Sequence, residues 1–206
     1  MNITSEIGSQ IKFYVYGDTK APKREEGDAG IDIFIPNLSE NFMKSLTEKN
    51  PGQPFRWGLM GAPQSEEDLK NNKGVFLYIP AHEDIIIPTF VKSRFPKNLC
   101  LRVSNKSGVA LHQKLIIGAE IIDSSYEGEI LIHVFNASNQ TRFLEFGQKI
   151  AQLIPEIIDN QPIELYYDAT LPQFSEFKNT VTESDFYKDH DSHRGEKGFG
   201  EGTGTK

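Results

Sequence analysis

Short extended runs separated by turn residues are the feature that most restricts the fold of this chain. β-branched and aromatic residues concentrate in these runs, and Gly, Pro, Asn and Asp stand between them. This alternation is typical of an all-β barrel or jelly roll, whereas β-α-β units would need long helical patterns between the strands. The strands predicted in this way are residues 11–16, 31–35, 75–79, 84–87, 90–92, 99–103, 114–117, 129–135, 149–154 and 163–167.

Three prolines recur at a regular spacing in the middle of the chain. Pro80, Pro88 and Pro96 each follow an extended run. Because proline cannot donate a ladder hydrogen bond, we expect each of them to close a strand. The pattern therefore predicts a mainly β fold with many short strands.

Residues 36–74 depart from this rhythm and predict a partly helical insertion. Asn37 and Glu40, three residues apart, resemble the cap of a helix, with apolar residues at helical spacing behind them. Residues 65–69 predict the start of a second short helix. The segment is too short to bury a core of its own, so we expect it to pack on the barrel.

Composition restricts the class of partner and the compartment. The 206 residues carry a net charge of −7, which argues against broad binding of nucleic acid. The single cysteine, Cys100, excludes an internal disulfide and a four-cysteine zinc site, and its apolar neighbours predict a buried thiol. The chain shows no signal pattern and no apolar run near the roughly 20 residues that span a bilayer. We therefore expect a cytoplasmic protein without membrane contact.

The tail from Leu171 onward predicts an arm without a fold of its own. Its last part combines closely spaced glycines with the guanidinium of Arg194 and the ring of Phe199. Free backbone amides and a guanidinium suit phosphate oxygens, and an aromatic ring suits the face of a base. A lid that closes on a ligand and a disordered tail both fit this pattern. The expected organisation is a β domain over residues 1–170, including the insertion, and a flexible arm over 171–206.

One carboxylate stands where a hairpin would line a pocket. Asp123 follows an apolar run directly, and Tyr126 and Gly128 come shortly after it. Such a carboxylate can accept a proton from water and act as a general base. An aspartate that only satisfies a β-turn is the alternative.

Five segments, taken in order, resemble the five motifs of the trimeric dUTPase family. They are residues 29–33, 105–110, 121–129, 147–154 and the tail from Arg194. The resemblance implies a distorted jelly-roll subunit and a homotrimer with shared active sites. It implies a dUTP diphosphatase that hydrolyses dUTP to dUMP and pyrophosphate with help from Mg²⁺.

The resemblance also assigns roles to individual residues. Asp123 would activate the attacking water, Tyr126 would pack against the deoxyribose, and Phe199 would stack over uracil. Asp32 would help to hold the waters of a Mg²⁺ ion that sits mainly on phosphate oxygens. The residues implied to bind substrate are Lys106, Ser107, Gly108, Ile117, Ile122, Tyr126, Gln152, Arg194, Phe199, Gly200 and Thr203.

Several positions depart from the family pattern. Lys106 stands where the family usually has arginine, so a bidentate phosphate contact becomes a point charge. Glu120 replaces a glycine beside the uracil hairpin and faces either outward or into the pocket. Glu201 stands near the phosphate-binding end of the arm. Gln148 and Lys149 replace an Asp-Arg pair that we interpret as structural.

Two other functions use the same scaffold. A related deoxynucleotide enzyme such as a dCTP deaminase is one, although the complete fifth motif argues against it. A regulatory or protein-binding module is the other, with the insertion 36–74 and its Trp57 as the contact surface for a protein partner.

Overall fold

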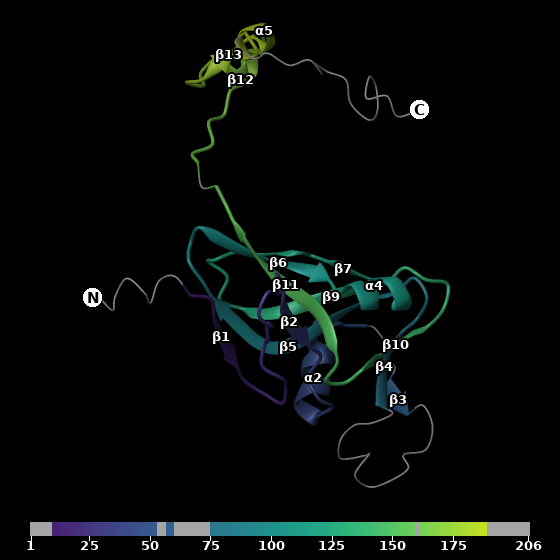
Figure 1. Cartoon of the computed structure of the whole chain (residues 1–206). Coiled ribbons are helices and arrows are strands. Elements are labelled where there is room, and N and C mark those ends of the chain that lie inside the picture. Colours follow the sequence, from purple (N-terminus) through teal and green to yellow (C-terminus); the bar gives the residue numbers. More distant parts are fainter. Residues whose placement is uncertain (1–9, 53–56, 60–74, 160, 189–206) are drawn as a thin grey trace, which may run out of the picture. The chain divides into compact units, whose positions relative to one another are not determined.

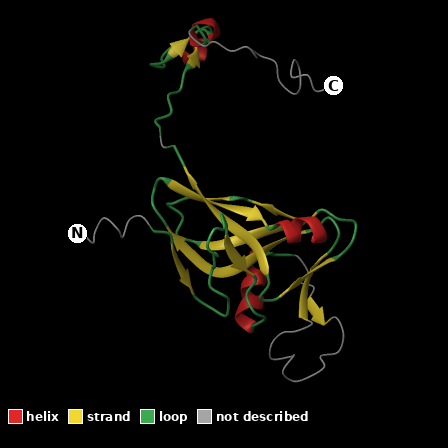
Figure 2. Ribbon diagram, in the orientation of Figure 1, coloured by secondary structure: helices red, strands yellow, loops and turns green. Residues whose placement is uncertain are grey.

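Antiparallel strands are the main regular structure in the computed structural model (Figure 1). It describes residues 10–52, 57–59, 75–159 and 161–188, with 57–59 described by backbone only. Figure 2 shows strands throughout the larger unit and only short helices beside them. The mainly β fold class expected from the sequence is confirmed. The chain divides into two compact units, Met1–Asp159 and Asn160–Lys206.

The first sheet of the larger unit has the strand order β1-β5-β9-β7. Its antiparallel register places Tyr14 opposite Lys92 and Ile87 opposite Ile132. The strands are β1 (Lys12–Val15), β5 (Asp84–Arg94), β9 (Glu129–Asn136) and β7 (Leu115–Gly118).

The second sheet has the order β2-β11-β6-β8, and β11 is paired on both edges. Gln152 of β11 lies opposite Asp32 on one side and opposite Ser104 on the other. The strands are β2 (Ile31–Phe34), β11 (Lys149–Ile157), β6 (Leu99–Asn105) and β8 (Ile121–Ile122). A third sheet joins β10 (Arg142–Glu145), β4 (Val75–Ile79) and β3 (Trp57–Leu59).

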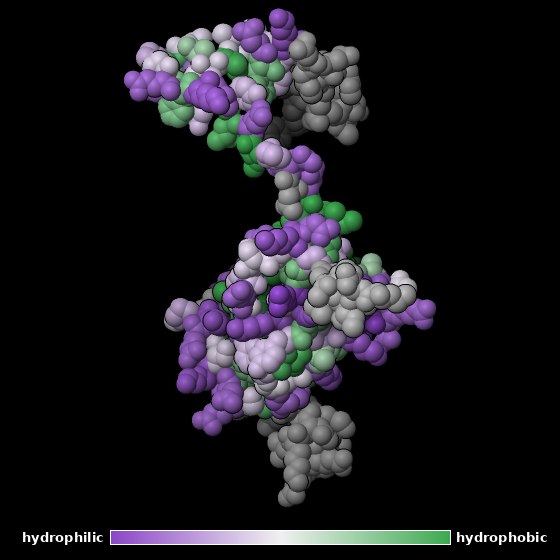
Figure 3. Space-filling view, turned by 90° about the vertical axis from the view of Figure 1, so that its left-hand side faces the viewer, coloured by the Kyte–Doolittle hydropathy of each residue, from purple (hydrophilic) through white to green (hydrophobic). Residues whose placement is uncertain are grey.

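Alternate residues of these strands form one hydrophobic core. In β9, Ile130, Ile132 and Val134 are buried, while the residues between them are partly or largely exposed. Burying each such side chain contributes about 1.5–3 kcal/mol. Cys100 is buried as expected. On the face of the larger unit drawn in Figure 3, hydrophilic side chains predominate, in keeping with an apolar interior.

The first helix begins two residues later than the sequence predicted. Helix α2 spans Glu40–Lys49, and its cap is Ser39, whose hydroxyl accepts from the Phe42 N–H. The prediction that Asn37 caps this helix is wrong, because the Asn37 amide donates to Asp18 Oδ1 at 2.9 Å instead. Phe42 and Leu46 are fully buried, so the helix is part of the core.

A short helix and one proline also differ from the prediction. Helix α4 (Ser107–Gln113) was not expected, and its C-cap is Lys114, which has a φ of 55°. The expectation that Pro88 closes a strand is wrong, because β5 continues through it with a bulge between Pro88 and Lys92. Strand β1 pairs with β5 only from Val91 onward. No strand therefore lies beside Pro88 on that edge, and the absence of an N–H at Pro88 breaks no hydrogen bond there.

The second unit has elements of its own: β12 (Tyr167–Asp168), a 3₁₀ turn (Pro172–Phe174), β13 (Thr180–Val181) and α5 (Glu183–Phe186). The Tyr167 ring lies 5.2 Å from the ring of Phe174 and 4.3 Å from that of Phe177. This packing ties Tyr167 to residues that come after it in the chain, within the compact unit that begins at Asn160.

The predicted strand 163–167 is wrong except for its last residue. Ile163 and Leu165 are 87% and 60% exposed, and only Tyr167 enters a sheet. The predicted helix at 65–69 and the residues from 189 onward lie outside the described residues. Within the described ranges, no helix is long and apolar enough to cross a membrane.

Candidate active site

Asp32 lies at the centre of an ionic cluster formed by three strand ends. Lys106 binds its Oδ1, and the Nζ of Lys149 lies 2.6 Å from its Oδ2. Asp32 is 8% exposed. Burial pushes the pKa of its carboxyl upward, but the hydrogen bonds from Lys106 and Lys149 outweigh burial and hold the pKa below its ordinary value. Asp32 is therefore an anion shared by two ammonium groups.

Gln152 lies beside this cluster on the central strand β11. Its Nε2 donates to the main-chain oxygen of Asn105 at 2.9 Å. A Cβ on Gly30 would clash with the Gln152 carboxamide oxygen. Gly30 therefore leaves the space that this carboxamide occupies.

Ser107 and Gly108 begin helix α4 directly after Lys106 and are both exposed. A Cβ added to Gly108 would meet no atom within 4 Å. The space beside Gly108 is therefore open, so the packing of the chain itself does not require glycine there. Together with Asp32, Lys106 and Gln152, these residues form one group, which we call the phosphate-side group.

The hairpin after β7 borders an open cavity of about 170 Å³. Its turn contains Ala119, which has a φ of 52°. The residues that line the cavity are Ala119, Ile121, Ile122, Asp123, Tyr126, Glu129, Ile130 and Leu131. The structure thus brings Asp123, Ile122 and Tyr126 together, as the sequence predicted.

Hydrogen bonds hold Tyr126 at this cavity. Its N–H donates to the Asp123 main-chain oxygen at 3.0 Å, and its hydroxyl donates to the Glu129 main-chain oxygen at 2.9 Å. A Cβ on Gly128 would clash with the Tyr126 ring. Asp123 itself is exposed, so its carboxylate is open to water.

Ile117 supports the hairpin from behind the cavity. Its side chain is 4% exposed, and its N–H donates to Asn105 Oδ1 at 2.9 Å. Ile117 is not one of the residues that line the cavity.

Glu120 does not line the cavity either. Its main-chain oxygen accepts from the Val103 N–H at 2.6 Å. The charge of its exposed carboxylate contributes to the raised pKa of the Arg102 guanidinium. The departure at Glu120 therefore adds no charge to the wall of the cavity.

Glu129 lines the cavity and interacts with Tyr16. Glu129 Oε1 accepts from the Phe90 N–H at 2.7 Å. Burial, followed by the charge of Glu129, raises the pKa of Tyr16 to about 12. The sequence pattern did not identify the contact between Tyr16 and Glu129, because the two residues are distant along the chain.

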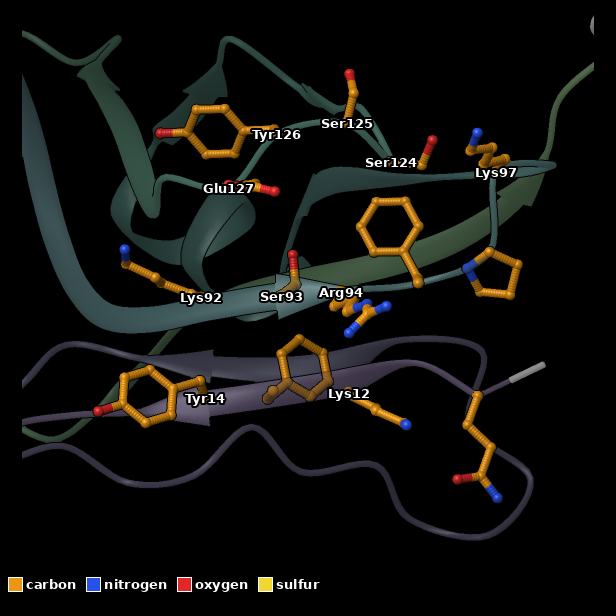
Figure 4. A pocket seen from close by; sticks show the side chains of 14 residues that line it. Lys12, Tyr14, Lys92, Ser93, Arg94, Lys97, Ser124, Ser125, Tyr126 and Glu127 are labelled. Carbon is orange, nitrogen blue, oxygen red and sulfur yellow. The ribbon is translucent and has the colours of Figure 1, made fainter. Parts of the chain in front are cut away.

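A larger hollow of about 720 Å³ adjoins the other side of the same turn. In Figure 4, Ser124, Ser125, Tyr126 and Glu127 lie across from Lys12 and Tyr14, with Lys92, Ser93 and Arg94 between them. The Tyr126 turn therefore separates a small cavity, which Asp123 and Glu129 help to line, from a wide hollow lined by several cations.

The described residues offer no ready-made metal cage. In the ranges that the structure covers, no three His, Cys, Asp or Glu side chains gather at one point. Asp32 is the carboxylate of the phosphate-side group, and each of its oxygens already binds a lysine. This donor set fits Mg²⁺ only if the ion's other ligands are waters and phosphate oxygens.

Four of the predicted substrate-binding residues lie outside the described residues. They are Arg194, Phe199, Gly200 and Thr203. Lys149 and Asn105 also contact this site, although the sequence did not place either of them among the site residues. The sequence places Lys149 three residues before Gln152 and Asn105 beside Lys106, but only cross-strand pairing gives them partners.

Comparison with known proteins gives one consistent result. The dUTPase family model matches residues 68–202. A deoxyuridine 5'-triphosphate nucleotidohydrolase of Oryza sativa subsp. japonica is 34% identical over 80 residues, which is 39% of this chain and 47% of the relative. One of Candida albicans is 35% identical over 86 residues, or 42% of this chain and 54% of the relative. The chain thus spans about half the length of the curated relatives it matches.

Solved structures agree on the fold. A mutant of the Staphylococcus bacteriophage 80alpha dUTPase with dUpNHpp has a TM-score of 0.58 at 18% identity, covering 94% of this chain and 98% of that chain. The native EIAV dUTPase has a TM-score of 0.51 at 24% identity and covers 79% of this chain and 99% of that chain. A mutant of the phage phi11 dUTPase of S. aureus, described with a structural Mg(II) ion, has a TM-score of 0.54 at 17% identity, covering 76% of this chain and 96% of that chain.

Proposed function

The chain belongs to the dUTPase family, and we propose that it hydrolyses dUTP to dUMP and pyrophosphate. The observation that carries the proposal is the cavity between the β7–β8 hairpin and Tyr126, with the exposed carboxylate of Asp123 among its lining residues. A nucleotide hydrolase needs a shaped site for the base and an available proton acceptor near the scissile bond. This cavity supplies both requirements from one turn of the chain.

The size of the cavity favours one ring and its sugar. Its volume of about 170 Å³ is well below the roughly 300–1,000 Å³ of pockets for drug-sized ligands. Uracil would enter between Ile122 and the hairpin backbone, and the deoxyribose would lie against Tyr126. The hydrogen bond that fixes the Tyr126 hydroxyl supports a steric exclusion of a 2'-hydroxyl.

The triphosphate would extend to the phosphate-side group. Lys106, Ser107 and Gln152 would bind its oxygens, with Gly108 leaving open space beside them. We further propose a homotrimer in which neighbouring subunits complete each site. Ile157 at the end of β11 is 83% exposed, which supports a contact surface there.

Asp123 would act as the general base. Its carboxylate accepts a proton from a water whose oxygen forms a bond to the α-phosphorus, and the bond from that phosphorus to the bridging oxygen of the β-phosphate breaks. The leaving pyrophosphate takes the electron pair. Positive charge from Lys106, and from Arg194 of the arm, stabilises the negative charge that develops on the phosphate oxygens.

Mg²⁺ would travel with the substrate. Bound to phosphate oxygens and waters, it supplies charge neutralisation to the triphosphate. Asp32 would contact its waters, in keeping with a carboxylate that is ionised and hydrogen-bonded. Phe199 would cover the base, and Gly200 and Thr203 would bind phosphate from the arm.

Replacement of Asp123 by Asn tests the proposal. Asn cannot accept the proton, so kcat for dUTP is expected to fall by about 10²–10⁴-fold while the dissociation constant of a non-hydrolysable dUTP analogue stays close to the wild-type value. Glu127→Gln is the matched control, since it removes one exposed carboxylate from the same turn without touching the cavity. Near-normal turnover in Asp123→Asn would remove Asp123 as the base.

A further inference from the structure

Asn105 binds both halves of the candidate site. It is the last residue of β6 and is partly buried. Its side-chain oxygen accepts from the Ile117 N–H at 2.9 Å, and its main-chain oxygen accepts from Gln152 Nε2 at 2.9 Å. Lys106, which binds Asp32, follows it directly.

Strand β6 explains why a residue at this position reaches both halves. One edge of β6 pairs with β11, which carries Gln152. The other edge pairs with β8 at Leu101 and Arg102 and then binds Glu120 through the Val103 N–H. β6 is thus a shared strand, with phosphate-side residues on one edge and the hairpin on the other.

The strand-to-strand ladder on the hairpin side ends before Asn105. Its last backbone bond runs from Val103 to Glu120. At the level of Ile117, the Asn105 side chain takes over as acceptor, on the edge of β7 that faces away from β9. The start of the hairpin is therefore held by one side-chain hydrogen bond, which a substitution can remove.

We propose that Asn105 is a positioning residue that sets the base-binding hairpin relative to the phosphate-binding residues. The proposal rests on the proposed function for its kinetic consequences. The two bonds come from different parts of Asn105, so they can be separated. The side chain holds the hairpin, while the main-chain oxygen holds Gln152 in every variant.

Asn105→Leu removes the acceptor at nearly constant size and leaves the buried Ile117 N–H without a partner. Unpaired buried donors are costly, so the hairpin is expected to shift toward water. Asn105→Asp keeps an acceptor oxygen at the same distance along the side chain and is expected to restore the contact. Asn98→Leu is the control, because Asn98 is exposed just before β6 and undergoes the same chemical change.

The kinetic test uses the full chain with dUTP, dUMP and pyrophosphate. In Asn105→Leu, KM for dUTP and the inhibition constant of dUMP are expected to rise about tenfold, the equivalent of one lost hydrogen bond. The inhibition constant of pyrophosphate is expected to stay unchanged, because Gln152 keeps its anchor. Asn105→Asp should return dUMP binding to near the wild-type value, and Asn98→Leu should match the wild type.

Two results would overturn the inference while the wild type still hydrolyses dUTP. One is unchanged dUMP binding in Asn105→Leu. The other is an equal loss of dUMP and pyrophosphate binding that Asn105→Asp does not rescue, since this would mark a general structural role.

Hydrogen exchange separates this inference from the proposed function. The amide of Ile117 is expected to exchange slowly in the wild type and in Asn105→Asp, and faster in Asn105→Leu. This readout needs no substrate, so it remains decisive if the wild type fails to hydrolyse dUTP. Equal exchange at Ile117 in all three proteins would refute the role of the Asn105 side chain.

Discussion

Two lysines bind Asp32, and this affects the consequence of having lysine at position 106, where the family usually has arginine. A lysine in place of arginine loses bidentate geometry. Here Lys106 and Lys149 share one carboxylate, so the three side chains together carry a net positive charge of one next to Gln152. A triphosphate would therefore bind at a site whose positive charge is partly neutralised. One of the two lysine ammonium groups could leave Asp32 and bind a phosphate oxygen.

The ionised state of Asp32 predicts a pH dependence of stability. Its folded pKa lies below the ordinary value of 3.8, so it stabilises the fold fully above that value and loses this contribution as pH falls through the lower folded pKa. The difference in unfolding free energy between the wild type and Asp32→Asn should be constant at neutral pH and shrink below about pH 4. Urea unfolding at several pH values measures it, and a difference that grows toward acid would contradict the ionic cluster.

Residue-level prediction from the sequence succeeded where the partners are close in sequence. Asp123 and Tyr126 share one turn, so their spacing led us to expect both at one pocket, and both line the same cavity. Lys149 and Asn105 find their partners on other strands. Those contacts depend on the pairing of strands, which a local sequence pattern does not predict. Asn37 fits the local pattern of a helix cap, but its amide binds Asp18, and Ser39 caps the helix instead.

At the scale of elements, helix α2 is joined to the first sheet by Asn50. The Asn50 amide donates to the main-chain oxygens of Leu46 and Ile86, and its oxygen accepts from the Ile86 N–H, each at 2.8 Å. Asn50 is 5% exposed. The first part of the insertion 36–74 is therefore bound into the barrel, and deletion of the whole segment would open the core at Phe42 and Leu46.

Asn50→Ala tests this joint. Loss of its hydrogen bonds leaves partly buried main-chain groups of Ile86 without these partners, so the unfolding free energy is expected to fall by about 1–3 kcal/mol. Glu48→Ala, an exposed change on the same helix, serves as the control. Chemical denaturation measures both variants, and equal stability of the two would contradict the joint.

Strand prediction succeeded where alternation of buried and exposed residues governs the run, as in β9 and β4. It failed at 163–167, whose apolar residues have the right period but find no sheet partner in the described chain apart from Tyr167. Pro88 was misjudged because its tolerance depends on the short length of β1. These errors arise from tertiary context, which overrides local propensity.

At the scale of the whole molecule, the core lies within one unit. The buried apolar cluster runs from Ile31 to Leu153, inside the unit Met1–Asp159. The fifth motif begins at Arg194, outside that unit. Folding and substrate closure are thus expected to be separable.

Truncation before Arg194 tests this separation. It is expected to reduce dUTP turnover nearly to the background rate, since it removes Arg194 and Phe199, without lowering the melting temperature of the larger unit. Activity assays and thermal unfolding on the same preparation measure the two effects. A truncated chain with full turnover would remove the arm from the mechanism.

Pyrophosphate release from dUTP, dCTP, dTTP and UTP, each with Mg²⁺, tests the central claim most directly. We expect release from dUTP alone, in line with the proposed binding of uracil at the hairpin cavity and the proposed exclusion of a 2'-hydroxyl by Tyr126. Release from none of the four by a folded oligomer would contradict the proposed function and favour the regulatory or protein-binding alternative. Equal release from dUTP and UTP would contradict the role of Tyr126.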